Sequence, residues 1–214
     1  MTYELMPPED MKTCIGLAAK AFGNYDFFSV YIPNKKISRF LRSMLGMEFR
    51  VNHGLVHYLT AKENGRIVAV AIVRDPSYQL PNEKQYLKAG FWKNFVIGGY
   101  KNVTAWLDMD QKAGVPCQEL IAREENTWFL HLLAVDVTME GKGLGSKMLK
   151  ECVIPYVRRL DGERLCLYTN SEINRKFYTK NGFQEFDEQF FSYNDRCFGS
   201  WSYQMELGDA ERSA

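Results

Sequence analysis

Residues 128–146 read WFLHLLAVDVTMEGKGLGS, and this stretch decides how the chain is organised. Its first half, Trp128 to Val135, is a nearly continuous apolar run of strand length, which is typical of a buried strand. Its second half, Glu140 to Ser146, carries alternate glycines and leads into an amphipathic segment that extends to about Leu160. A strand, a glycine-rich turn and a helix therefore follow one another directly.

The glycine-rich turn predicts a site for a phosphate group. Glycines at 141, 143 and 145 leave several backbone N–H groups unshielded, and the positive N-terminal end of the following helix favours an anion. The turn matches neither G-x-x-x-x-G-K-[ST] nor G-x-G-x-x-G, because both need glycine where Ser146 stands. A tight turn that needs glycine for its backbone alone is the alternative interpretation.

A second pattern lies on a helix predicted from Ser171 to Lys180. Asn174 and Tyr178 are spaced one helical turn apart, and the apolar pair Ile173 and Phe177 lies beside them. One face of this helix is expected to pack, while its neighbour presents an amide and a phenol. A plain packing role for Tyr178 is the alternative interpretation.

Together the two patterns resemble the GCN5-related N-acetyltransferases (the GNAT family). The cofactor motif of that family looks like the stretch from Val135 to Gly145. Glu140 stands where the family has Gln or Arg, so its side chain is expected to point away from the pyrophosphate. The flanking residues are similar to the branch of puromycin-type antibiotic acetyltransferases, although Tyr168 stands where that branch often has Glu. The second family motif is matched at Asn174, Phe177, Tyr178, Gly182 and Phe183, and the flanking residues are Trp128, Phe129, Leu130, Leu167 and Thr169.

The resemblance implies that an amine attacks the thioester of acetyl-CoA through a tetrahedral intermediate. It implies that a backbone N–H, at Leu133, donates to the thioester oxygen and that the strand opens there to bind pantetheine. It also implies that Tyr178 protonates the departing thiolate, which makes Tyr178 the catalytic residue. The implied cofactor-binding residues are Leu133, Ala134, Val135, Gly141, Lys142, Gly143, Leu144, Gly145, Ser146, Asn174, Phe177 and Tyr178.

The general base and the acceptor stay open at this stage. His131, Asp136, Glu172 and Glu119 could take the proton, and so could a water relay. The resemblance implies a primary amine of a small molecule, antibiotic-like or metabolic, as the acceptor. A peptide or protein amine is the alternative, and a non-catalytic acyl-CoA sensor is another. Aromatic side chains that could line an acceptor pocket, or simply fill the core, are Phe22, Tyr25, Phe27, Phe28, Tyr31, Tyr86, Phe91, Trp92, Phe95, Tyr100 and Trp106.

The remaining periodicity fits an α/β chain with a mixed, mostly antiparallel sheet and helices on both faces, as in the GNAT fold. We expect one domain over residues 1–207, with a helical insertion at 75–126, and a polar tail at 208–214. The expected strands are 3–6, 54–62, 66–74, 128–135, 164–169, 183–191 and 197–207, and the expected helices are 11–22, 35–47, 86–96, 103–112, 144–160 with a bend at Pro155, and 171–180.

Composition excludes several classes of protein. The 27 Lys and Arg against 26 Asp and Glu leave a formal charge of +1, so neither a nucleic acid nor a membrane is expected as a partner. Charged residues interrupt every apolar run, and the first residues lack the pattern of a secretory signal. Five scattered cysteines indicate free thiols, no metal and a cytoplasmic location. The oligomeric state is left open between a monomer and a homodimer.

Overall fold

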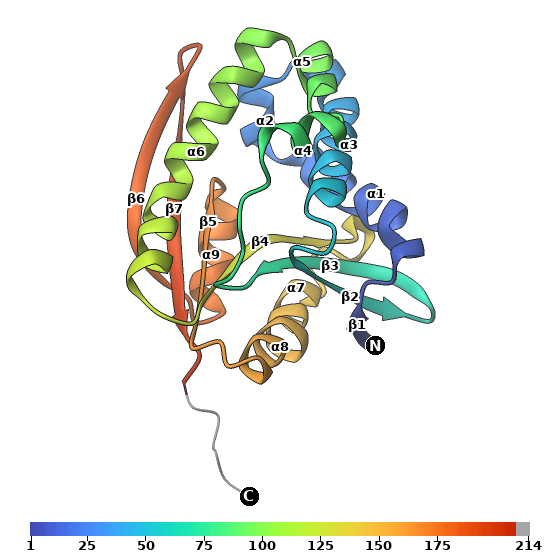
Figure 1. The fold of residues 1–214 in the computed structure, drawn as a ribbon, viewed down its shortest axis with the longest axis vertical. Helices are drawn as coiled ribbons and strands as arrows, with labels where there is room; N and C mark the ends of the chain where they lie inside the picture. The colour runs from blue at the N-terminus through green and yellow to red at the C-terminus, as the bar shows by residue number, and fades with distance from the viewer. Residues whose placement is uncertain (209–214) are drawn as a thin grey trace, which may run out of the picture.

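The apolar run at Trp128 lies in β4 (Thr127–Val135), the middle strand of a seven-stranded sheet with the order β1-β2-β3-β4-β5-β7-β6 (Figure 1). The computed structural model describes residues 1–208, apart from the side chains of Asn24 and Asp26, and residues 209–214 of the expected tail lie outside it. β4 and β5 are parallel and the other neighbours are antiparallel, which confirms the mixed, mostly antiparallel sheet. The other strands are β1 (Thr2–Leu5), β2 (His57–Glu63), β3 (Arg66–Arg74), β5 (Arg164–Thr169), β6 (Gln184–Tyr193) and β7 (Arg196–Glu206).

Helices cover both faces of the sheet, as expected. Figure 1 shows α1 (Met11–Ala21) and α3 (Asn34–Val51) on one side of β3 and β4, and α7 and α8 on the other. Strand β3 is buried over most of its length because alternate residues enter two different cores. Val70 and Ile72 pack with the α1 and α3 side, whereas Ala69 and Ala71 pack with the α7 and α8 side. This two-sided burial explains why β3 is apolar throughout.

The hairpin between β2 and β3 forms at the predicted Asn-Gly step. Asn64 and Gly65 have φ values of 49° and 77°, and Glu63 pairs with Arg66 across the turn. Two successive residues with positive φ are what a two-residue hairpin turn requires. None of the helices in the described residues is both long and apolar enough to cross a bilayer.

Two irregularities of β4 position the site. The register with β3 shifts by one residue, so Ile72 pairs with Leu132 while Val73 pairs with Leu130, and His131 is the extra residue of a β-bulge. On its other side β4 pairs with β5 only over residues 127–129. Beyond Phe129 the two parallel strands separate, which leaves the edge of β4 that faces β5 unpaired up to Val135.

The helix expected over 144–160 is present but not uniform. It consists of α7 (Leu144–Lys147), a π-helical segment (Met148–Val153) and α8 (Ile154–Arg159). Pro155 has no N–H to donate to the preceding turn, and the wider π-helical segment lies immediately before it. The helix type thus changes close to the residue at which a bend was expected.

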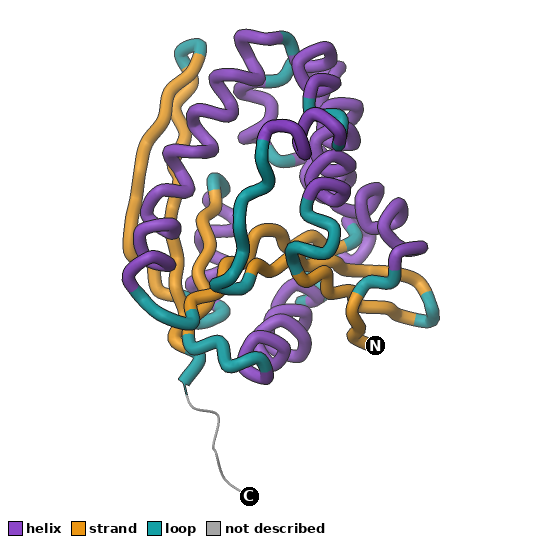
Figure 2. Tube along the Cα trace, viewed as in Figure 1, coloured by secondary structure: helices purple, strands orange, loops and turns teal. Residues whose placement is uncertain are grey.

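The expected helical insertion differs in its divisions. Three helices lie between β3 and β4, where two were expected. Figure 2 shows the loop, in teal, that leads from the sheet to the first of them. The three helices are α4 (Glu83–Lys88), α5 (Trp92–Gly98) and α6 (Tyr100–Arg123). Gly90, with φ of 93°, separates the first two, and α6 continues through Pro116 to Arg123 instead of ending near residue 112. A short helix α2 (Asp26–Tyr31), which was not expected, joins α1 to α3, and α9 (Glu172–Lys180) follows β5 as predicted.

Candidate active site

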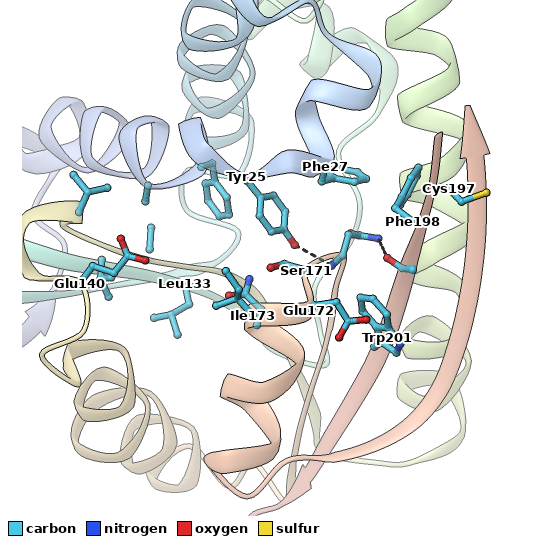
Figure 3. Close-up of a pocket in the computed structure, with 18 of the residues that line it drawn as sticks. Tyr25, Phe27, Leu133, Glu140, Ser171, Glu172, Ile173, Cys197, Phe198 and Trp201 are labelled. Atoms are coloured by element: carbon cyan, nitrogen blue, oxygen red, sulfur yellow. Dashed lines mark hydrogen bonds between the residues drawn. The ribbon is translucent and has the colours of Figure 1, made fainter. Parts of the chain in front are cut away.

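A cavity of about 670 Å³ lies where β4 and β5 separate. Figure 3 shows Tyr25 and Phe27 reaching into it from the start of α2, Leu133 from β4, Ser171 and Ile173 from the start of α9, and Phe198 from β7. Segments from four distant parts of the chain therefore meet at this point. The full lining is Ala21, Phe22, Tyr25, Phe27, Leu133, Ala134, Val135, Val137, Glu140, Asn170, Ser171, Glu172, Ile173, Asn174, Phe190, Cys197, Phe198, Gly199 and Trp201.

The two sequence motifs touch each other beside this cavity. A Cβ atom placed on Gly145 would lie 3.1 Å from Cζ of Phe177, so the ring of Phe177 packs directly on the glycine-rich turn. Leu144 is buried at the start of α7 and anchors the turn from below. Phe177 can pack this closely on the turn only because residue 145 has no side chain, so the two motifs depend on each other at this contact.

The glycine-rich turn has the geometry of an anion site. Gly141 and Gly143 have φ values of 76° and 74°, and a Cβ atom on either would meet nothing within 4 Å. Within residues 1–208, neither glycine amide has a backbone acceptor. The side chain of Asp136 accepts from the Thr138 amide at 2.9 Å and holds the chain that leads into the turn. Free amides in open space at the start of a helical segment suit a pyrophosphate.

Glu140 lines the cavity, as Figure 3 shows. That its side chain points away from the pyrophosphate stays a prediction. Lys142 in the same turn is exposed and donates to Sδ of Met139 at 3.6 Å. The turn therefore carries one acidic and one basic side chain, whose charges cancel. Its attraction for an anion consequently comes from the backbone N–H groups.

Tyr178 lies behind the cavity wall, whereas Tyr25 lies in it. Tyr178 is only 8% exposed, and its ring packs against Phe177 and Phe183 with centroids 5.1 and 5.4 Å away. Burial raises the pKa of the Tyr178 hydroxyl well above its usual value, and the nearby Tyr25 hydroxyl raises it further. Tyr178 therefore keeps its proton at neutral pH.

The hydroxyl of Tyr25 is held at the end of β5. It accepts a hydrogen bond of 2.9 Å from the backbone amide of Asn170 and lies 3.2 Å from Oγ1 of Thr169. Burial raises the pKa of Tyr25, while hydrogen bonds from Thr169, Asn170 and Asn174 act in the opposite direction. Because Asn174 also lines the cavity, Tyr25 joins the α1 to α2 connection to the second sequence motif.

The four carboxylate and imidazole groups considered as bases lie in different places. Glu172 lines the cavity. Asp136 caps the Val137–Met139 turn and pairs with Arg66 at 2.5 Å, and Glu119 is exposed on α6. His131 is the bulged residue of β4, and its Nε2 lies 3.6 Å from Oε2 of Glu48 on α3. Of the four, the structure brings only Glu172 to the cavity wall.

His131 belongs to a polar cluster between α3, β3 and α6. Its Nε2 lies 3.3 Å from Nη2 of Arg74, and burial together with the charge of Arg74 lowers the pKa of His131. Nearby, the Tyr168 hydroxyl donates to Oδ1 of Asp110 at 2.7 Å. Within residues 1–208, no group of three or more His, Cys, Asp or Glu side chains is arranged to hold a metal ion.

Asp110 makes stability depend on pH. Burial raises the pKa of its carboxyl from 3.8 to about 6, so between these values the folded chain binds more proton than the unfolded chain. The contribution of this carboxyl to the free energy of unfolding therefore falls by up to about 3 kcal/mol as the pH rises through that window. Asn at this position can still accept from Tyr168 and has no charge to bury. We expect Asp110→Asn to match the wild type in thermal unfolding near pH 4 and to melt higher above pH 6; an equal difference at both pH values would contradict this.

The aromatic candidates divide into three groups. Phe22, Tyr25 and Phe27 line the cavity. Most of the others pack in the core as expected for the alternative interpretation, and two are exposed. The packed residues are Phe28, Tyr31, Tyr86, Phe91, Phe95 and Trp106, and the exposed ones are Trp92 and Tyr100.

Sequence reasoning missed one wall of the cavity. Phe190, Cys197, Phe198, Gly199 and Trp201 come from the hairpin of β6 and β7. Alternation predicts these strands, but it carries no signal that their outer ends turn toward β4. All five cysteines of the chain are free, and Cys197 is the exposed one.

Comparison with protein families gives one match. Residues 102–185 match the model of the acetyltransferase (GNAT) domain. The matched segment contains β4, the glycine-rich turn, β5 and α9, which are the elements that form the site. Among curated proteins, none matches the chain.

Solved structures share the fold over nearly the whole chain. A histone acetyltransferase HPA2 and related acetyltransferase from Corynebacterium glutamicum is 18% identical, with 94% of each chain covered and a TM-score of 0.59. The ribosomal-protein-S18-alanine N-acetyltransferase from Escherichia coli is 13% identical, covering 100% of this chain and 97% of its own, with a TM-score of 0.56. The PaiA N-acetyltransferase from Thermoplasma acidophilum, solved with coenzyme A, is 14% identical, covering 96% of this chain and 99% of its own, with a TM-score of 0.55.

Proposed function

We propose that this chain is a GNAT acetyltransferase that uses acetyl-CoA, and that it acetylates a primary amine of a small, partly apolar molecule. The observation that carries the proposal is the cavity of about 670 Å³ at the separation of β4 and β5. Its aromatic lining by Phe22, Tyr25, Phe27 and Phe198 suits an apolar body, and its volume suits a ligand of modest size. An antibiotic-like or metabolic amine fits this description.

The cofactor would lie along the open edge of β4. Unpaired backbone groups between Leu133 and Val135 would bind pantetheine, and a backbone N–H at Leu133 would donate to the oxygen that becomes negative as the amine attacks. Donors of this kind, already in place, are worth roughly 2.7–4 kcal/mol. The amides of Gly141–Ser146 would hold the pyrophosphate, with Lys142 beside them. Acetyl-CoA supplies the activated acetyl group.

Two groups would move protons during the transfer. Tyr178 would give its proton to the departing thiolate. Glu172, which lines the cavity, would receive a proton from the ammonium of the acceptor, directly or through water, and the free amine would then attack the thioester. The role of Glu172 as the base rests on its position, because Glu172 lines the cavity whereas His131 and Glu119 do not. Asn174 would orient the cofactor from the same helix.

The finer assignment to the puromycin-type branch is also part of the proposal. Its support is the set of matching residues around β4 and β5 and the aromatic lining of the cavity. A peptide amine is the second candidate, and the exposed cavity residues Ile173 and Phe190, 76% and 71% exposed, favour it because they form an apolar rim that a chain could cross. Retention of Tyr178 and Asn174 speaks against a sensor without turnover.

A thiol-release assay tests the function. The purified chain is given acetyl-CoA with a panel of small aromatic and aliphatic amines and a matched panel of short peptides with free N-termini. We expect CoA release with the small amines, a preference for apolar ones, and a lower rate with Glu172→Gln. Release with peptides alone would replace the proposed acceptor, and binding of acetyl-CoA without release from any amine would replace the enzyme by a sensor.

A further inference from the structure

Positive charge is concentrated in two segments that are distant in the sequence. Residues 34–52 and 83–101 together contain nine Lys or Arg and two Glu, a net charge of +7. Because the whole chain carries +1, the remaining residues carry −6. The near-neutral total therefore conceals a strongly polarised molecule. The nine cations are Lys35, Lys36, Arg39, Arg42, Arg50, Lys84, Lys88, Lys93 and Lys101.

The two segments form one surface. Oγ of Ser43 on α3 donates to Oδ1 of Asn94 on α5 at 2.7 Å, and Nη2 of Arg50 donates to the carbonyl oxygen of Ala89 at 2.8 Å. Figure 1 shows α3, α4 and α5 together at one end of the molecule. We call the exposed side of α3, α4, α5 and the first residues of α6 the basic surface.

The charged residues exposed on α3 are all cationic. Lys35, Arg39 and Arg42 are exposed and follow one another at intervals of four and three residues, which places them on one face. The single acid of α3, Glu48, is turned inward toward His131. Among the side chains that the structure describes, which do not include Asp26, none of the nine cations forms an ion pair with a carboxylate. Their charge is therefore available to an external anionic partner.

Large apolar side chains are exposed among these cations. Leu87, Trp92, Val96 and Tyr100 are 56%, 53%, 70% and 76% exposed. Trp92 and Val96 lie one turn apart on the outer face of α5, while Ile97 of the same helix is buried. A helix that is apolar on both faces and covered on only one indicates a contact surface.

We propose that the basic surface binds the face of a membrane that contains anionic lipids. Lys and Arg interleaved with Trp, Leu and Val form the pattern of segments that lie in the interface of a bilayer, where the cations meet headgroups and the apolar groups enter the acyl region. A nucleic acid would use the charges and the aromatic rings but would give no partner to Leu87 and Val96. This revises the expectation, drawn from net charge, that a membrane is not a partner.

The basic surface is separate from the cavity. None of the residues that line the cavity belongs to 34–52 or 83–101. A bilayer on the basic surface would consequently leave the cavity lining free, and the inference holds whether or not the proposed acceptor is correct. The inference adds a location, the surface of an anionic membrane, to the proposed catalytic activity.

Vesicle co-sedimentation of the full chain tests the inference. Vesicles of phosphatidylcholine alone and of phosphatidylcholine with phosphatidylglycerol are compared at low and high salt. We expect binding to the anionic vesicles only, weakened by salt, with a shift of tryptophan emission to shorter wavelength that is lost in Trp92→Phe. The triple variant Arg39→Glu, Arg42→Glu, Lys93→Glu should bind at least tenfold more weakly.

Matched variants separate this surface from charge in general. Lys12→Glu with Lys180→Glu reverses exposed cations elsewhere and should leave vesicle binding unchanged. Trp92→Ser with Val96→Ser keeps the charge and should also weaken binding, and CoA release by each variant reports that it is folded. Equal sedimentation with neutral vesicles, or wild-type binding by the triple variant, would overturn the inference. Binding of an RNA oligonucleotide that the triple variant loses, with no vesicle binding by the wild type, would overturn it in favour of nucleic acid.

Discussion

Replacing Tyr178 with Phe should lower turnover at least about tenfold while the affinity for CoA changes less than twofold. The thiol of CoA has an ordinary pKa near 8.5 and a phenol one near 10, so transfer of a proton from the phenol to the thiolate is slightly uphill and is expected to be concerted with cleavage of the C–S bond. Tyr178 is 8% exposed and keeps its proton at neutral pH, because burial raises its pKa. Phe fills the same space, so packing against Phe177 and Phe183 is retained.

The measurement is steady-state CoA release with a saturating amine, together with calorimetric binding of CoA. Tyr203→Phe is the matched control, since this second buried phenol lies with its ring 5.9 Å from Tyr178 and donates instead to Glu185 at 2.6 Å. It should keep its turnover. Wild-type turnover by Tyr178→Phe would remove Tyr178 from the mechanism, and Tyr25→Phe would then test the phenol that lines the cavity.

The parts of the fold that follow local rules were predictable from the sequence. The β2 to β3 hairpin follows from Asn64-Gly65, and the order of β4, helix, β5 and α9 follows from hydrophobic period and length. The structure confirms this order. It was predictable because the residues of each segment are sufficient to indicate whether that segment is a strand or a helix. The helical insertion was less predictable, since Pro116 lies inside α6, where tertiary packing of its buried residues outweighs the lost backbone hydrogen bond.

The candidate site was predictable where chemistry and spacing coincide in one segment. The glycines at 141, 143 and 145 and the pair Asn174 and Tyr178 were identified from sequence, and their meeting at Phe177 and Gly145 supports the reading. The bulge at His131 and the wall from β6 and β7 depend on register and strand twist, which no short pattern encodes. The position of Glu140 on the cavity wall was not predicted for the same reason, because it depends on the path of the turn in three dimensions.

Replacing Gly143 with Val should weaken CoA binding at least about thirtyfold. Gly143 has φ of 74°, a conformation that costs an L residue roughly 1–2 kcal/mol and a β-branched one more. A side chain at this position meets nothing within 4 Å in the protein, so it would extend into the space in front of the turn where the pyrophosphate is proposed to lie. The strain is present with or without CoA and therefore lowers stability, whereas the obstruction acts on binding. Loss of a hydrogen bond to a charged phosphate costs about 2 kcal/mol, which corresponds to about thirtyfold in affinity.

Gly54→Val is the matched control for this prediction. Gly54 has φ of 79° and also has nothing within 4 Å of an added Cβ atom, but it lies in the turn before β2. Both variants should lose similar thermal stability, because the backbone strain is the same, and only Gly143→Val should lose CoA affinity in calorimetry. If the two variants bind CoA equally well, the turn at 141–146 does not hold the pyrophosphate. If both lose affinity in proportion to stability, strain alone explains the loss and the proposed contact with the cofactor is wrong.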